Sequence, residues 1–288
     1  MVIDLQDVGS RYYTYVWTAA LMYQRCVACG VECVVLDRPN PLDGETLEGA
    51  PQREGYRSFV GLFDVPVRHG LTIGEVVTMV QQLDRRPAES LHVVSLQGWD
   101  RGQGFEATGL PWVLPSPNMP TLDTARVYPG GCLLEGTNLS EGRGCTRPFE
   151  IFGAPFVDGS ALAREVQAPG VVLRPLTFEP TFHKHGGKSC GGVQVHVTEP
   201  GRVRSFALYL RLIAAIAARA PDAFAWRTDT YEFVSDRPAI DLLHGGPKYR
   251  QAVEAGEELD DLLHWHDQRA EAFRTLREPF LLYRGPTP

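Results

Sequence analysis

The sequence has no long apolar segment and no excess of positive charge. The longest apolar run, around residues 206–218, is interrupted by Arg211 and is shorter than the ~20 residues that a membrane-spanning helix needs. Lys and Arg number 28 against 35 Asp and Glu, which gives a net charge of −7. A protein that neutralises nucleic-acid phosphates over a broad face has the opposite balance. The sequence therefore predicts no membrane span and no nucleic-acid partner.

The sequence also lacks the usual signatures of cofactor and metal sites. The Gly-x-Gly sequences at 102–104 and 142–144 have no third glycine and no strand–turn–helix context, so neither matches a dinucleotide-binding motif. Cys26 and Cys29 have the spacing of zinc ligands, but no second pair completes a set of four. We predict no cofactor and no metal. We interpret the 6 cysteines as small buried thiols rather than a disulfide framework.

Length and composition indicate a soluble globular protein with room for two domains. The chain has 288 residues, of which 43% are hydrophobic and 22% are charged, a balance typical of folded proteins. Residues 1–5 resemble a buried parallel strand, and no signal peptide precedes them. Because a domain rarely begins inside its own sheet, we expect the natural protein to have further N-terminal residues. The compartment stays undetermined.

The first half of the sequence alternates between strand and helix patterns. Apolar residues at helical spacing over residues 12–29 are followed by a short apolar strand at 32–36. Thr72 and Glu75 form a capping box that predicts a helix to about residue 84, and a third strand follows at 91–96. This order predicts a parallel α/β sheet with right-handed crossovers.

The second half has a different pattern, which indicates a separate domain. Four prolines between residues 111 and 120 predict a stiff connection and a domain boundary there. An alternating strand is expected at residues 192–198, followed by helices at 206–220, 247–255 and 259–276. We therefore predict a partial α/β domain over residues 1–121 and a smaller α+β domain over residues 122–288.

Polar residues follow the first two predicted strands. Ligands of parallel sheets bind in the crevice outside the carboxyl ends of the strands, so these residues are candidate ligand contacts: Asp7, Arg11, Tyr12, Asp37, Arg38 and Asn40. A surface ion pair and a turn at Asn40 are an equally good interpretation. Arg68 and His69 either belong to the same site or form a capping loop, and Asn118 lies in a segment that could be only a rigid linker.

The densest polar segment is residues 135–150. It holds three carboxylates, two arginines and three glycines in sixteen residues. Glycine lets backbone approach a ligand, and hydroxyl, amide and guanidinium groups donate directional hydrogen bonds. We prefer a sugar-binding site with carboxylates for acid–base chemistry over a solvated loop. Its candidate residues are Asn138, Ser140, Glu141, Arg143 and Glu150.

Several segments in a fixed order resemble those of a known bacterial family. They are DLQDVGSRYYTY, DRPNP, SFVGLFDVPVRHGLTIGE, PSPNMPTLDTARVYPGGCLLEGTNLSEGRG, RPFEIFGAP, CGGVQVHVT and the terminal PFLLY. From Asp4 to the end of the chain, this series resembles the NamZ-type exo-β-N-acetylmuramidases. The resemblance implies a Rossmann-like domain that here lacks its N-terminal strands, a smaller C-terminal domain, and a site in the cleft between them.

The resemblance also implies an activity and its residues. The family hydrolyses terminal, non-reducing β-1,4-linked N-acetylmuramic acid from peptidoglycan fragments, without a cofactor, so muropeptides or disaccharides are the expected partners. Glu141 is the first candidate for a catalytic carboxylate, followed by Asp7 and Glu150. Arg143, Arg11 and Arg68 are the candidates for contact with the lactyl carboxylate of the sugar.

The sequence departs from the family pattern at its beginning. Family members start well upstream, with a GPEHG-like motif whose glutamate is a catalytic candidate, and many carry an export signal there. Neither is present in this chain, so we treat the activity of this chain separately from that of the family. The alternatives are a non-catalytic muropeptide-binding protein that uses the same cleft, and a Rossmann-like transferase or dehydrogenase, which the missing glycine motif disfavours.

Overall fold

The first half of the chain folds around a parallel sheet of three strands. In the computed structural model, which describes residues 1–283, β1 (Val2–Ile3), β2 (Cys33–Leu36) and β3 (Leu91–Val94) lie in that order. Both strand pairs are parallel. The helices α1 (Tyr15–Ala28) and α2 (Ile73–Leu83) make the connections that parallel strands require. The predicted parallel α/β sheet is confirmed.

Apolar side chains of these strands and helices form one core. The register places Ile3 beside Val35 and Val35 beside Val93. Ile3 and Val35 are buried together with Trp17 of α1 and Val77 of α2. These positions follow the periodicities of strands and helices, so burial of apolar surface explains why the segments form these elements.

The second half contains an antiparallel sheet. The strands β4 (Ile151–Ala154), β5 (Val171–Phe178) and β6 (Cys190–Val197) are arranged in the order β4-β6-β5, and both pairs are antiparallel. The predicted alternation is present in β6, where Val193 and Val195 are buried. An α+β second half is therefore confirmed.

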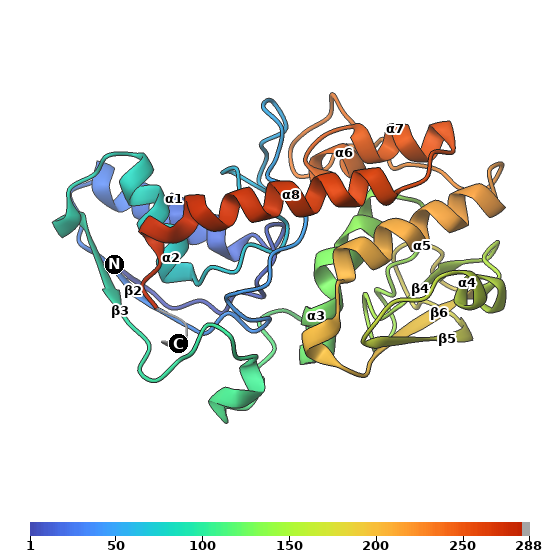
Figure 1. Cartoon of the computed structure of the whole chain (residues 1–288), viewed down its shortest axis with the longest axis horizontal. Helices are drawn as coiled ribbons and strands as arrows, with labels where there is room; N and C mark the ends of the chain where they lie inside the picture. Colours follow the sequence, from blue (N-terminus) through green and yellow to red (C-terminus); the bar gives the residue numbers. More distant parts are fainter. Residues whose placement is uncertain (284–288) are drawn as a thin grey trace.

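Helices cover this second sheet and extend beyond it (Figure 1). In chain order they are α3 (Leu122–Gly131), α4 (Gly159–Glu165), α5 (Ser205–Arg219), α6 (Ala239–His244), α7 (Lys248–Ala255) and α8 (Asp260–Arg277). Short 3-10 turns occur at Ala88–Ser90, Phe105–Thr108, Cys132–Gly136, Pro200–Arg202 and Glu278–Phe280. Among residues 1–283, no helix is both long enough and apolar enough to cross a membrane.

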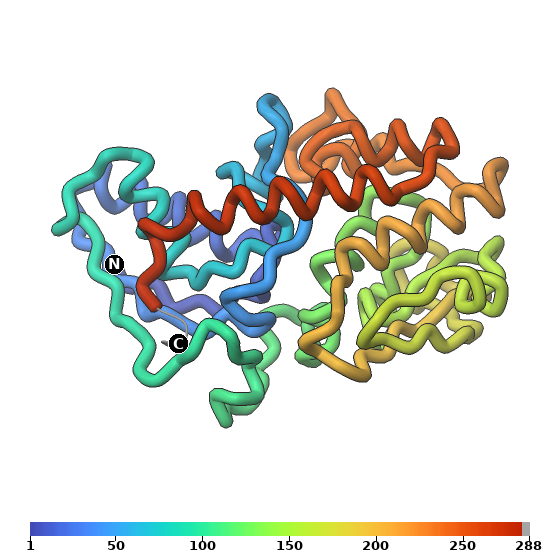
Figure 2. The backbone as a smooth tube through the Cα atoms, in the orientation of Figure 1, coloured from blue at the N-terminus to red at the C-terminus, as the bar shows by residue number. Residues whose placement is uncertain are grey.

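The last helix connects the two halves. α8 runs from beside α6 and α7 back across the molecule to the parallel sheet, so the end of the described chain lies near its beginning (Figures 1 and 2). Phe273 packs into the core of the first half, and the Tyr283 hydroxyl donates to Asp37 at 2.6 Å. The boundary after residue 121 stays a prediction, and residues 284–288 of the second predicted domain lie outside the described residues.

The helix predicted over residues 12–29 begins later than its apolar pattern suggests. The backbone N–H of Tyr13 donates to the carbonyl of Ser10 at 2.9 Å, which forms a turn before α1 begins at Tyr15. Tyr12 and Tyr13 are still buried. Their apolar pattern reflects packing in this turn rather than helix, because burial alone does not fix the backbone conformation.

Candidate active site

Glu141 lies in a tightly folded loop between the 3-10 turn at Cys132–Gly136 and β4. Its side chain is 0% exposed, and its backbone carbonyl accepts from the N–H of Phe149 at 2.7 Å. The next residue, Gly142, has a φ of 77°, and a Cβ there would lie 2.2 Å from the carbonyl oxygen of Ile151. Glycine is therefore required for the loop to fold around the buried carboxylate.

Three cationic or protonatable side chains surround the Glu141 carboxylate. Arg143 Nε and His183 Nδ1 each lie 3.1 Å from Oε1, and Lys184 Nζ lies 3.1 Å from Oε2. Burial opposes ionisation of this carboxyl group, but the contact from His183 and the charge of Lys184 lower its pKa to about 2. Glu141 is therefore ionised at neutral pH and cannot act there as a proton donor.

His183 and Lys184 lie on a strained loop at residues 180–188. His183 and His185 have φ values of 68° and 58°, which non-glycine residues rarely adopt. Lys184 Nζ also donates to the carbonyl of Leu134 at 2.9 Å, and His185 Nε2 lies 2.8 Å from the carbonyl oxygen of Asn138. Ion pairs and hydrogen bonds thus hold this loop over the Glu141 segment, and strain of this kind is typical of functional sites.

Arg143 is held on both sides by carboxylates. Its Nη2 donates to Glu135 Oε1 at 2.6 Å, while Glu135 Oε2 accepts from the Tyr231 hydroxyl at 2.8 Å. The guanidinium also lies over the ring of Phe149, 5.4 Å from its centroid. Arg143 is therefore fixed in place, with about a quarter of its side chain exposed (27%).

A pocket of about 460 Å³ opens beside this cluster. The Asn138 amide shapes its wall, because Nδ2 donates to the carbonyl of Ala223 at 2.8 Å and Oδ1 accepts from the N–H of Ala225 at 3.1 Å. The lining combines an indole face, basic groups, hydroxyls and one carboxylate: Thr137, Asn138, His183, Lys184, His185, Trp226, Arg227, Thr228 and Asp229. This combination suits a polar ring compound that carries a negative charge.

The other two predicted residues of this loop bond to nearby protein groups. The Ser140 hydroxyl accepts from the N–H of Gly142 at 3.2 Å. Glu150 accepts from the hydroxyls of Thr121 at 3.0 Å and Thr124 at 2.6 Å, at the beginning of α3. Both side chains are buried. Their hydrogen bonds shape the loop and cap α3.

Asp7 belongs to a second polar group, after β1. Its Oδ2 accepts from the N–H of Gly9 at 2.7 Å and lies 3.6 Å from His69 Nε2. The N–H of Leu71 donates to His69 Nδ1 at 3.1 Å, so the proton of the neutral ring is on Nε2, facing Asp7. Asp7 Oδ1, Ser10 Oγ, Tyr13 Oη and His69 Nε2 are buried without a hydrogen-bond partner among residues 1–283. Buried polar atoms are rarely left unpaired without a functional reason.

A short series of aromatic contacts links the Asp7 group to the Glu141 group. The rings of Tyr13 and Tyr128 have centroids 6.0 Å apart, and those of Tyr128 and Phe149 are 4.8 Å apart. Phe149 is the ring beneath Arg143. The structure therefore brings polar groups that are far apart in the sequence to two sides of one aromatic cluster.

The arginines of the first half are committed to the protein itself. Arg11 is fully buried and donates to three backbone carbonyls, including that of Leu243 at 2.6 Å. Arg68 forms buried ion pairs with Asp43 at 2.7 Å and Glu48 at 3.2 Å. This geometry favours structural roles, and contact with a substrate carboxylate stays a prediction for both.

The remaining predicted residues of the first half also have local partners. Asp37 accepts from Gly74 N at 2.8 Å, where α2 begins, and the Asn40 amide forms the expected turn by accepting from Leu42 N at 3.1 Å. The Tyr12 hydroxyl donates to a backbone carbonyl. Arg38 forms an exposed ion pair with Asp4 at 2.6 Å, and Asn118 is half-buried.

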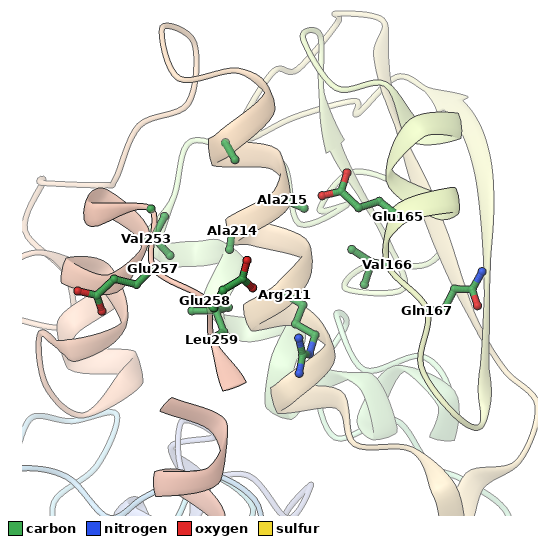
Figure 3. A pocket seen from close by; sticks show the side chains of 12 residues that line it. Glu165, Val166, Gln167, Arg211, Ala214, Ala215, Val253, Glu257, Glu258 and Leu259 are labelled. Atoms are coloured by element: carbon green, nitrogen blue, oxygen red, sulfur yellow. The ribbon is translucent and has the colours of Figure 1, made fainter. Parts of the chain in front are cut away.

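A different pocket, of similar size, lies on the far part of the second half. It is formed by α5 together with the ends of α4 and α7, and the labelled side chains of Glu165, Arg211 and Glu258 border it (Figure 3). None of the residues predicted from the sequence lines it. Among residues 1–283, no group of three or more His, Cys, Asp or Glu side chains is arranged to hold a metal ion.

Sequence reasoning found Glu141 and Arg143 but missed His183 and Lys184 as their partners. The spacing of the two histidines in this loop gives no reason to connect them with a glutamate some forty residues earlier. The signal in the sequence was weak: a His-Lys-His tripeptide followed by two glycines.

Similarity to known proteins shows the family to which this chain belongs. The family model described as exo-beta-N-acetylmuramidase NamZ, N-terminal, matches residues 1–123, and its C-terminal counterpart matches residues 126–283. The chain belongs to the NamZ family. A NamZ family member of Bacillus subtilis (strain 168), the peptidoglycan beta-N-acetylmuramidase NamZ, is 39% identical over 286 residues. The match covers 98% of this chain and 67% of that relative.

Two solved structures have the same fold. Both are crystal structures of DUF1343 family proteins from Bacteroides fragilis NCTC 9343, with TM-scores of 0.85 and 0.75 and sequence identities of 30% and 26%. The similarity covers 98% and 99% of this chain but 74% and 75% of those chains. It confirms the predicted fold class, a mixed α/β chain with a parallel and a separate antiparallel sheet.

Proposed function

We propose that this protein is an exo-β-N-acetylmuramidase, a glycoside hydrolase that releases terminal, non-reducing β-1,4-linked N-acetylmuramic acid from peptidoglycan fragments. The observation that carries this proposal is the match of the NamZ family models to both halves of the chain. The 39% identity with a peptidoglycan beta-N-acetylmuramidase supports it. Muropeptides and disaccharides are the substrates that follow from this activity.

We place the muramic acid residue in the pocket beside Glu141. The indole of Trp226 offers an apolar face to a sugar ring, and Thr228 offers a hydroxyl group. Lys184 and Arg227 supply positive charge for the lactyl carboxylate, which distinguishes muramic acid from glucosamine. The pocket volume of about 460 Å³ leaves room for one sugar residue with its substituents.

The surroundings of Glu141 and Asp7 indicate which part each carboxylate can take in catalysis. Glycosidases use a proton donor and a second carboxylate. Glu141, with a pKa of about 2, takes an ionised role: it holds Lys184 and Arg143 in position beside the pocket. Asp7 keeps one side-chain oxygen without a hydrogen-bond partner and faces His69. It is buried on the other side of the aromatic cluster and does not line this pocket, so proton transfer by Asp7 stays a prediction.

The test is turnover of two chromogenic glycosides by the chain, one of N-acetylmuramic acid and one of N-acetylglucosamine. We expect hydrolysis of the muramic acid glycoside but not of the N-acetylglucosamine glycoside. Loss of turnover in Asp7→Asn would support proton transfer by Asp7. Arg227→Gln removes one charge-assisted contact with the lactyl group and should raise KM about tenfold for the muramic acid glycoside. The matched variant Arg219→Gln lies outside the pocket, paired with Glu165, and should change neither value.

Each negative outcome of this test contradicts a different part of the proposal. Equal turnover of both glycosides would contradict the assignment of this pocket to the muramic acid residue. Binding of N-acetylmuramic acid without release of sugar would favour the non-catalytic muropeptide-binding function instead. Full activity of Asp7→Asn would remove Asp7 from proton transfer and leave the family assignment intact.

A further inference from the structure

A second, smaller pocket lies where the first half meets α6, α7 and α8. Its volume is about 240 Å³. Residues 51–53 form one wall, the turn between α6 and α7 at residues 244–248 forms another, and Trp265 and Arg269 of α8 form the third. It shares no lining residue with the pocket beside Glu141.

The charges around this pocket are all positive. Arg53, Lys248 and Arg269 line it, and no Asp or Glu does. None of the three takes part in the ion pairs found among residues 1–283, whereas other arginines do, such as Arg126 with Asp123 and Arg250 with Glu254. The arrangement is unusual in a chain with 35 acidic and 28 basic residues. A concave site with unbalanced positive charge attracts anions.

Contacts with neighbouring residues hold two of these cations at the pocket. Lys248 Nζ lies 4.0 Å from the ring centroid of Trp265, a cation–π contact that restricts the long side chain. The aliphatic part of Arg53 lies against Gly246, since a Cβ on Gly246 would be 3.5 Å from Arg53 Cβ. The N–H of Arg53 donates to the carbonyl of Gly245 at 2.7 Å, which fixes residues 51–53 against the turn.

The rear wall adds no negative charge. His244 is buried, its Nε2 lies 2.8 Å from His266 Nε2, and His266 Nδ1 accepts from the N–H of Ala50 at 2.8 Å. His266 Nε2 therefore carries the proton and donates to His244, whose Nδ1 proton faces the carbonyl of Gly246 at 3.0 Å. Burial lowers the pKa of both histidines, so both rings are neutral, and His244, the one of the two that lines the pocket, adds no charge. The positive side chains therefore determine the ligand.

We propose that this pocket binds a small anion through a carboxylate or phosphate group, held by Arg53, Lys248 and Arg269 at the junction of the two halves. A bound anion bridges residues 51–53 to α8 and so stabilises the contact between the halves. The inference is independent of the muramidase assignment, because it rests on different residues.

The experiment is a titration of the full chain with three probes. Calorimetry measures binding, and the unfolding temperature measures stabilisation. The probes are inorganic phosphate, N-acetylmuramic acid and the uncharged N-acetylglucosamine. We expect saturable binding and a rise in Tm with at least one of the two anions and none with N-acetylglucosamine, and weaker binding at high ionic strength. Phosphate binding without N-acetylmuramic acid binding identifies a phosphate ligand. Because N-acetylmuramic acid is also proposed to bind beside Glu141, its binding identifies a sugar carboxylate as the ligand of this pocket only where the variants below weaken it.

Variants connect the binding with this pocket. Arg269→Gln and Lys248→Gln should each weaken the anion about tenfold while keeping the wild-type turnover of the muramic acid glycoside. Arg174→Gln, an exposed arginine on β5 outside the pocket, is the matched control and should bind as the wild type does. Absence of saturable anion binding, or binding that Arg53→Gln, Lys248→Gln and Arg269→Gln all leave unchanged, overturns the proposal whether or not the chain is a muramidase.

Discussion

At the scale of single residues, the candidate active site depends on one buried carboxylate. Removing Glu141 from water is unfavourable, and its three contacts at 3.1 Å with Arg143, His183 and Lys184 compensate for that cost. The same contacts hold the loop at residues 180–188 against the loop that contains Glu141. A positioning role for Glu141 therefore follows from its burial, because a carboxylate that is 0% exposed does not itself face the pocket.

Glu141→Gln should lower both stability and activity. The pKa of about 2 lies below the ~4.3 of an unfolded glutamate, and the difference corresponds to about 3 kcal/mol of free energy of unfolding. Because the folded pKa is the lower one, this contribution is complete above about pH 4.3 and is lost as the pH falls through about 2. Urea unfolding of the wild type and Glu141→Gln should differ at pH 7 and converge toward pH 2.

Glu165→Gln is the matched control for this prediction. Glu165 pairs with Arg219 on the surface, where both side chains are more than a third exposed, so its loss should change stability by no more than about 1 kcal/mol. A difference between wild type and Glu141→Gln that persists unchanged from pH 7 to pH 2 would contradict the electrostatic origin of the effect.

At the scale of elements, the sequence signals were strongest where the side chains of a segment form hydrogen bonds with backbone groups of the same segment. The capping box of α2 is present as predicted: Thr72 Oγ1 accepts from Glu75 N at 3.2 Å and Thr72 N donates to Glu75 Oε2 at 3.0 Å. The structure adds a contact that the sequence did not show, since the Thr72 hydroxyl donates to Asp37 at 2.7 Å. Asp37 thus joins the end of β2 to the beginning of α2.

Thr72→Ala should destabilise the protein by about 1–2 kcal/mol, because it removes the helix cap and one of the buried donors to Asp37, while Gly74 and Tyr283 still donate. Thr72→Ser keeps the hydroxyl and should restore most of the loss. Thr78→Ala, on the same helix, removes only a hydroxyl that donates to the carbonyl of Gly74 and should cost less than about 0.5 kcal/mol. Chemical unfolding measures all three, and equal losses for Thr72→Ala and Thr78→Ala would refute the capping argument.

At the scale of the whole molecule, the two halves share buried contacts. Arg11 of the first half donates to the carbonyl of Leu243, Ala50 donates to His266 of α8, and Phe273 of α8 lies in the core of the first half. These contacts join segments that are more than two hundred residues apart in the sequence. The halves are therefore expected to depend on each other for stability.

We predict that both halves unfold in one cooperative transition. Hydrogen exchange in increasing denaturant should give the same opening free energy for the amides of β2 in the first half and β6 in the second. Far-UV circular dichroism and tryptophan fluorescence should give coincident transitions. Exchange of β2 amides at clearly lower denaturant than β6 amides would show that the halves unfold separately.

Elements with a strong local signal and the polar loops could be predicted from the sequence, whereas α3, β4, α4, β5 and α6 were not predicted. Periodicity gave α5 and α8 to within a few residues, and the density of carboxylates, arginines and glycines marked residues 135–150. The functions of individual arginines could not be read in this way. Arg11 and Arg68 look like binding residues in a sequence, but the fold buries both among the protein's own oxygens.

By itself, the sequence determined the strand and helix order of the first half, the cap of α2, the prominence of Glu141 in a polar loop and, through its ordered motifs, the family. Only the tertiary structure decided that His183 and Lys184 face Glu141, that α8 returns to the parallel sheet, and that Arg53, Lys248 and Arg269 gather around one pocket. The physical reason is the distance along the chain over which each interaction acts. Backbone hydrogen bonding and apolar periodicity act within a segment, whereas a buried charge takes its partner from whichever distant segment the packed core places beside it.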